Sequence, residues 1–129
     1  MQPELFSQRS AGAQVVTGVV VPAAFGFVAG IVLGLSGAGY LLLSLLAIAG
    51  GILAGLEHRG GEEGLVRGVT GGLLFGSFIL FAHAFVGGKA KTNLPSPEIL
   101  LVLITTVVGG LLGALGGWRR SRRPAQPQA

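Results

Sequence analysis

Four long apolar stretches separated by short polar breaks constrain the fold of this chain more than any other feature of its sequence. They cover about 15–35, 40–56, 65–86 and 99–118. None contains Asp, Glu or Lys, and Arg67 lies only at the start of the third. Because a helix needs roughly 20 mostly apolar residues to cross a bilayer, each stretch is predicted to be a transmembrane helix. The predicted fold class is therefore all-α, a polytopic membrane protein with four helices arranged as two hairpins.

Composition excludes the main alternatives to a membrane protein. Charged residues make up 11% of the chain, whereas a soluble domain carries about 25% and a disordered chain combines high charge with low hydrophobicity. The chain has no cysteine, which excludes disulfides and thiolate metal sites. The first apolar stretch is longer than the roughly 7–15 residues of a signal peptide core. We therefore interpret it as an uncleaved span.

The first two breaks predict how the helices are joined. Residues 36–39 (SGAG) leave room only for a tight turn, so the first two helices form a hairpin. Residues 57–64 (EHRGGEEG) are interpreted as a solvated loop. Glu62 and Glu63 then occupy the first turn of the third helix, where the helix dipole favours negative charge. Glu63 and Arg67 are four residues apart, which predicts an exposed ion pair.

The third break carries signals for a helix end and a helix start. Gly87 and Gly88 are expected to end the third helix. Ser96, Pro97 and Glu98 are expected to start the fourth, as the N-cap, the first helical residue and an acid in the first turn.

Lysine and arginine residues near the helix ends predict the orientation. With the N-terminus inside, the inner segments hold Arg9, Arg59, Arg67, Arg119, Arg120, Arg122 and Arg123, against Lys89 and Lys91 outside. We therefore expect both termini in the cytoplasm and the protein in the plasma (inner) membrane of a prokaryote. Residues 1–14 form a cytoplasmic segment and 15–118 the transmembrane domain. Residues 119–129 are expected to be a disordered basic tail, whose Arg119, Arg120, Arg122 and Arg123 set the topology and lie near lipid headgroups.

Small residues recur at every fourth position in all four stretches. This spacing places them in one row on a helix, where they let two backbones approach closely. The rows are Gly26, Gly30, Gly34; Ala47, Gly51, Gly55; Gly60, Gly64, Gly68, Gly72, Gly76; and Gly109, Gly113, Gly117. We predict glycine-zipper packing along these small-xxx-small rows, and association with a second copy through glycines that internal packing does not use. The bulky residues of the third helix are expected to face lipid: Leu73, Leu74, Phe75 and Phe78.

Polar groups inside the spans are the first place to look for function. His83 lies near the expected outer end of the third helix, and we interpret it as an interfacial residue, with proton handling or ligand binding as the alternative. A candidate polar pathway consists of Ser77, His83, Thr105 and Thr106. Hydroxyl groups in helices commonly bond their own backbone instead. Pro22 removes a backbone hydrogen bond and is expected to kink the first helix.

The sequence has no pattern typical of an enzyme. Glu57, His58, Glu62 and Glu63 are potential metal ligands, but a zinc site needs ligands fixed by a second shell, and these lie on a short glycine-flanked loop. The glycine runs lack the strand–turn–helix context of a dinucleotide site. We predict no catalytic residue, metal or cofactor. The basic residues flank apolar stretches, so nucleic acid is not an expected partner.

The chain resembles uncharacterised small glycine-rich prokaryotic membrane proteins with four helices. These pair a GGxxAG element with a glycine-stepped helix after a short polar loop, as in residues 50–55 and then 60–76. The resemblance covers the second and third helices and implies no particular activity.

The sequence leaves two functions open. The first is a helix-packing structural module that self-associates or docks with another membrane protein, favoured by the absence of charged groups within the bilayer. The alternative is a pore or transporter for an ion or small solute. A holin-like action is included in this alternative, because phage holins are small and often end in a basic tail.

Overall fold

The computed structural model describes residues 4–87, 89–94, 96 and 98–122. The described chain is helical throughout its regular structure and contains no strand. Four continuous helical segments are long and apolar enough to span a membrane: Ala11–Leu33, Gly37–Gly55, Gly61–Val86 and Ile99–Arg122. The predicted all-α class and the four membrane-spanning candidates are therefore confirmed, and these helices indicate a membrane protein.

The first span combines three helical segments of two types, and its π-helical turn lies two residues before a proline. It consists of α1 (Ala11–Val15), the π-helical turn η2 (Val16–Val20) and α2 (Val21–Leu33). Within η2 the N–H of Val21 donates to Val16, five residues earlier. Pro22 has no N–H and its ring crowds the preceding turn, which a locally wider helix accommodates. The irregularity expected at Pro22 thus takes the form of a π turn.

Polar residues extend the helices beyond the apolar stretches that predicted them. Ser10 accepts a hydrogen bond from the N–H of Ala13 (3.2 Å) at the start of α1. Ser36 accepts one from the N–H of Gly39 (3.0 Å) at the start of α3 (Gly37–Gly55). These side chains satisfy N–H groups that a helix start leaves unpaired, so both helices begin several residues earlier than hydropathy suggested.

The third and fourth spans also exceed their predicted lengths. α4 (Gly61–Val86) begins four residues early and carries Glu62 and Glu63 in its first turn, as predicted. Gly87 ends it with a φ of +80°, a conformation that favours glycine. α5 (Ile99–Arg122) continues past Trp118, so residues 119–122 are helical and not part of an unstructured tail. Gly88, Pro97 and Arg123, which also featured in the predictions, lie outside the described residues.

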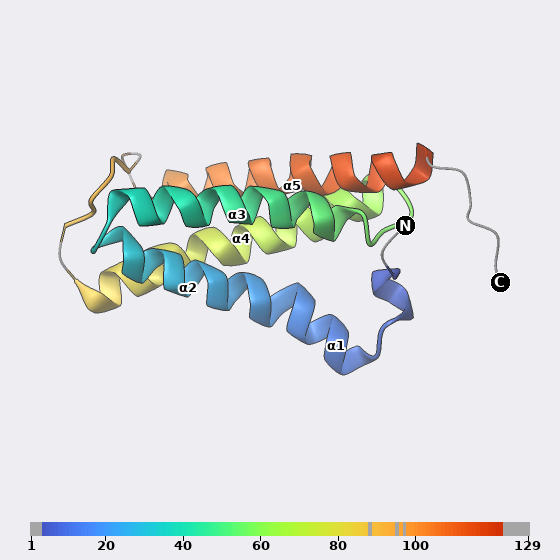
Figure 1. Cartoon of the computed structure of the whole chain (residues 1–129), viewed down its shortest axis with the longest axis horizontal. Helices are drawn as coiled ribbons and strands as arrows, with labels where there is room; N and C mark the ends of the chain where they lie inside the picture. The colour runs from blue at the N-terminus through green and yellow to red at the C-terminus, as the bar shows by residue number, and fades with distance from the viewer. Residues whose placement is uncertain (1–3, 88, 95, 97, 123–129) are drawn as a thin grey trace.

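The four spans run antiparallel along one long axis (Figure 1). The α4–α5 contact is the most extensive, α2 packs mainly on α4, and α3 packs mainly on α5. The α3–α4 connection lies at the same end of the bundle as the described N- and C-terminal segments. The turn at 34–36 and the connection at 87–98 lie at the opposite end.

An apolar core lies toward the end that contains the 34–36 turn. It consists of Ala29, Leu33, Tyr40, Ile79 and Leu101, with Ala90 and Leu94 of the 87–98 connection packed against it. The N–H of Lys91 donates to the carbonyl of Leu33 (2.8 Å), which ties this connection to the end of α2.

One expectation about the lipid-facing residues of α4 is wrong. Leu73 is exposed, as expected, and Leu74 and Phe78 are half-buried. Phe75, however, packs against the core, and its ring lies 5.8 Å from that of Phe25. Phe75 faces α2 because Gly26 leaves space for the α4 backbone beside it.

Candidate functional site

Glycines bring α4 and α5 together with backbone against backbone. The two helices are antiparallel, so each step of four along α4 matches a step of four back along α5. A Cβ built on Gly64 would overlap the carbonyl oxygen of Gly113, and one on Gly68 would overlap that of Gly109. Main-chain atoms cannot move aside as a flexible side chain can, so only glycine fits at this separation.

The same register continues at both ends of the seam. A Cβ on Gly117 would meet the carbonyl of Gly60, and one on Gly72 would meet the carbonyl of Thr105. A Cβ on Gly76 would meet the hydroxyl of Thr105 instead. The predicted rows of these two helices thus lie along one continuous contact, which we call the α4–α5 seam.

The other rows make shorter contacts. Gly26 and Gly30 of α2 lie against the backbone of Phe75 and Ile79 in α4. Gly55 of α3 lies against the backbone of Gly113, and Gly116 of α5 lies against that of α3. The four-residue spacing missed Gly116 because it falls on a different side of α5 from the predicted row.

Two glycines of the predicted rows, Gly34 and Gly51, and the adjacent Gly50 make no close backbone contact with the described part of another helix. The nearest atoms to a Cβ on Gly34 are 3.6–3.9 Å away, an ordinary packing distance. Gly51 faces the side chain of Leu112 at 3.3 Å, and Gly50 faces open space. The spacing alone therefore does not distinguish a backbone contact from an exposed glycine.

The candidate polar pathway is not assembled within the described residues. Ser77 lines a shallow hollow of about 320 Å³ together with Phe78 and Phe81. The hydroxyls of Thr105 and Thr106 both donate to the carbonyl of Val102, at 3.0 and 2.6 Å. His83 lies near the opposite end of α4 from the termini, and its buried Nδ1 has no hydrogen-bond partner in the described part of the chain. The two threonines therefore bond their own helix, and the hollow at Ser77 is lined otherwise by aromatic rings.

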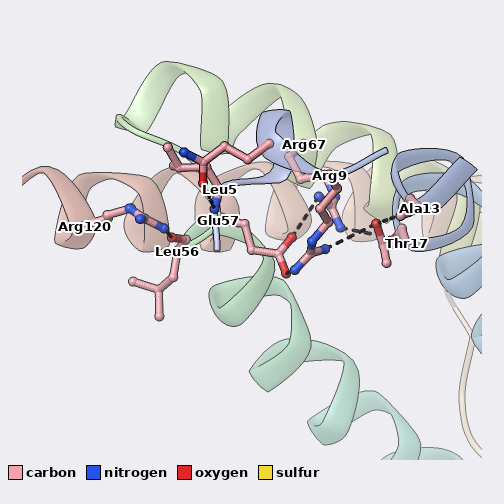
Figure 2. Close-up of polar contacts among 9 residues, drawn as sticks. Leu5, Arg9, Ala13, Thr17, Leu56, Glu57, Arg67 and Arg120 are labelled. Carbon is pink, nitrogen blue, oxygen red and sulfur yellow. Dashed lines mark hydrogen bonds and ion pairs between the residues drawn. The ribbon is translucent and has the colours of Figure 1, made fainter. Parts of the chain in front are cut away.

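A cluster of ionic contacts at the terminal end of the bundle was not predicted. The carboxylate of Glu57 accepts from Arg9 at 2.8 Å and from Arg67 at 3.3 Å (Figure 2). These side chains are only 15%, 20% and 9% exposed. They come from the α3–α4 connection, the N-terminal segment and α4. We call these three residues the Glu57 cluster.

The cluster corrects two predictions about the polar break. Glu57 and His58 are largely buried, so the break is not simply a solvated loop. Arg67 pairs with Glu57, and not with Glu63 as the spacing suggested. Glu63 instead accepts from the N–H of Arg59 (3.3 Å) and lies 3.9 Å from Nδ1 of His58. The chain reversal places Glu57 over the first turns of α4, where burial strengthens its contact with Arg67 relative to an exposed pair.

Arg67 also supplies a hydrogen bond that the first span lacks. Its Nη2 donates to the carbonyl of Thr17 at 3.2 Å. In a π turn this carbonyl would bond the N–H five residues later, but that residue is Pro22, which has none. Arg67 of α4 therefore supplies the hydrogen-bond donor that Pro22 cannot provide in the first span. The sequence signal for this contact was Arg67 itself, the single charged residue within the four predicted spans.

The N-terminal segment folds back onto the Glu57 cluster. The N–H of Phe6 donates to the carbonyl of Glu57 (2.8 Å), and Leu5 is buried. The ring of Phe6 lies 4.3 Å from the guanidinium carbon of Arg67 and 5.3 Å from the ring of His58. On the far side of the connection, Arg120 donates to the carbonyl of Leu56 (2.7 Å). Contacts from the N-terminal segment, α4 and α5 thus converge on the α3–α4 connection.

Burial lowers the pKa of His58, and the positive charge of Arg67 lowers it further. Glu63 and Glu57 oppose this change without reversing it. His58 therefore favours its neutral form, and its buried Nε2 has no hydrogen-bond partner among the residues that the structure describes.

Comparisons of the chain with protein-family models, with curated proteins and with solved structures find no match.

Proposed function

We propose that this protein is a structural module of a prokaryotic plasma (inner) membrane, with both termini in the cytoplasm. In this proposal the α4–α5 seam acts as a glycine zipper that holds the bundle together. The outer surface then associates with a second copy or with another membrane protein. The protein carries out no enzymatic reaction and needs no cofactor.

The observation that carries this proposal is the backbone contact along the α4–α5 seam. Glycine in a soluble helix costs about 1 kcal/mol relative to alanine, so a dense row is retained where close packing offsets that cost. Among the residues that the structure describes, no polar or charged side chain is fully buried. Both features favour a closed, packed interior over a hydrated pathway.

Self-association is supported by a glycine that the internal packing does not use. A Cβ on Gly50 would meet nothing within 4 Å, although this residue lies within a candidate span. α3 is also the least enclosed of the four spans. A second copy packed against α3 at Gly50 gives this glycine the same role as those in the seam. We therefore place the contact between copies on this face.

The test is the oligomeric state of purified protein in mild detergent. Gly50→Leu is expected to shift wild-type dimers or larger assemblies toward monomer. Ala24→Leu adds a side chain of the same size at another exposed position, on α2, and is expected to leave the assembly intact. A wild-type protein that is monomeric, or a Gly50→Leu variant with unchanged mass, would contradict contact through α3.

The alternative function, a small-solute or ion pore with a holin-like action as one form, is favoured by one observation. Ser77 places a hydroxyl at the hollow beside Phe78 and Phe81. Reconstitution into liposomes with trapped dye and ions separates the two proposals. The structural proposal expects leakage no greater than in empty vesicles, whereas protein-dependent leakage that is reduced by Ser77→Leu would favour a pore.

A further inference from the structure

The chain's own N-terminal segment fills an opening at the terminal end of the bundle. Figure 1 shows α1 leaning away from the other three spans at this end, with the short 3-10 helix η1 (Phe6–Gln8) between them. The ring of Phe6 also packs against the first span at Gly18, where a built Cβ would lie 3.3 Å from it. Residues 5–9 therefore occupy space between the first span and the α3–α4 connection.

Contacts of three residues hold this segment in place. Leu5 is buried, Phe6 makes one backbone hydrogen bond and several ring contacts, and Arg9 pairs with Glu57. Arg9 is also tied to the first span, since its carbonyl accepts from Gln14 (3.0 Å) and its guanidinium donates to the hydroxyl of Thr17 (3.5 Å). Ser7 and Gln8 on the same segment are exposed. A short segment with one buried side chain opens more readily than the long helices beside it.

His58 is the titratable group that the segment covers. From its own connection it faces Glu57, and from α4 it faces Arg67 and Glu63. α5 contributes the charge of Arg120, and the N-terminal segment contributes the ring of Phe6 and, through Glu57, Arg9. Of the residues that the structure describes, Glu57 and Glu63 alone favour a positive imidazole, and Glu63 is 62% exposed.

We propose that residues 5–9 form a releasable plug, and that protonation of His58 releases it and opens the Glu57 cluster to the aqueous phase. A proton taken from water places a positive charge on the largely buried imidazole of His58, beside the Phe6 ring and near the positive charge of Arg67. Displacing the plug hydrates the imidazolium and removes the apolar ring covering it. This device is independent of the structural role proposed above.

The direction of the pH dependence follows from linkage. With the plug in place, burial and Arg67 lower the pKa of His58. With the plug released, the hydrated imidazole returns toward its ordinary pKa of about 6.5. The released state therefore binds a proton more readily, and acid favours it as the pH falls below about 6.5.

The distance between two spin labels tests this proposal in the full-length protein. The chain has no cysteine, so Ser7→Cys and Ser121→Cys introduce two unique labelling positions, both exposed. In lipid nanodiscs at about pH 8, above the ordinary histidine pKa, one short, narrow distance distribution is expected. At about pH 5, below that pKa, a second population at longer distance is expected.

Two further variants make the test specific to His58 and to the plug. His58→Gln retains a polar neutral side chain and is expected to keep the short distance at both pH values. Arg9→Gln weakens the ion pair and is expected to raise the long-distance population already at the higher pH. An unchanged wild-type distribution at low pH would overturn the proposal, and so would a pH response that persists in His58→Gln. An Arg9→Gln variant without a longer-distance population would also contradict it.

Discussion

At the scale of single residues, two adjacent glycines in α4 have opposite packing environments. A Cβ on Gly72 would overlap the backbone carbonyl of Thr105, whereas one on Gly71 would meet only the ring of Pro22, at 4.0 Å. Gly72 is buried and Gly71 is half-buried. The adjacent positions differ by about 100° around the helix axis, which is enough to separate a backbone contact from an ordinary surface.

This contrast predicts opposite effects of the same substitution. Gly72→Ala is expected to destabilise the protein by about 1–3 kcal/mol or more, because the added methyl group must force two backbones apart. Gly71→Ala is expected to be neutral or to stabilise the helix by up to about 1 kcal/mol. Thermal unfolding in detergent, followed by the loss of monodisperse protein, measures both. Equal stability of the two variants would show that the seam does not depend on glycine.

The Glu57 cluster predicts a second residue-scale effect. Glu57→Gln removes the one carboxylate shared by Arg9 and Arg67, both of which are mostly buried. Hydrogen bonds to charged groups contribute about 1.5–3 kcal/mol, so a loss of about 2 kcal/mol is expected in the same unfolding assay. Glu62→Gln makes the same change at an exposed position and should cost less than about 0.5 kcal/mol. Equal effects would mean that the cluster contributes nothing specific to stability.

At the scale of elements, side chains from one helix complete the hydrogen bonding of another. Arg67 of α4 bonds the Thr17 carbonyl that Pro22 leaves without a donor. Arg120 of α5 bonds the carbonyl of Leu56, the residue directly after α3. A cation also interacts favourably with the negative end of a helix dipole. The irregular and terminal turns of the spans are therefore stabilised between helices as well as within them.

The end of α3 provides a test at this scale. Arg120→Gln is expected to lower the unfolding temperature, because it removes a charged donor from the last turn of α3, an interaction of about 0.5–2 kcal/mol. Arg119→Gln removes the same charge from an exposed neighbour and should have little effect on unfolding. The two variants have equal net charge, so a difference in stability reports on the contact itself. Indistinguishable unfolding curves would argue against a role for Arg120 in joining α3 to α5.

At the scale of the whole molecule, both hairpins open toward the same end. The Glu57 cluster, the basic end of α5 and the α3–α4 connection all lie there, while Lys89 and Lys91 lie on the opposite connection. The positive-inside rule predicts that the arginine-rich end faces the cytoplasm. The described arginines thus gather at the terminal end and the two lysines at the opposite end.

Orientation in the membrane is tested with single cysteines in the otherwise cysteine-free chain. Arg59→Cys and Lys91→Cys place one exposed thiol at each end. An impermeant thiol reagent applied to whole cells is expected to label position 91 and not position 59, and both should react after the cells are opened. Labelling at position 59 alone in intact cells would show that the protein has the opposite orientation.

Much of the architecture was predictable because it depends on local sequence. The length and apolar character of a span follow from bilayer thickness, and the glycine at the end of α4 and the acids at its start follow from the chemistry of helix ends. Helix starts at Ser10 and Ser36 were missed because hydropathy does not detect capping side chains. The partner of Arg67 was missed because spacing within one helix identifies neighbours on that helix only.

The sequence by itself determined the number, position and apolar character of the spans and the four-residue rows of glycine. Only the tertiary structure decided that Gly72 meets a backbone while Gly50 faces open space, and that Glu57 joins two arginines. These outcomes depend on the rotation and register of whole helices and on a contact between Arg9 and Glu57, 48 residues apart. A small residue permits close approach in any helix, but the side of the helix that is approached is set by the packing of all four spans together.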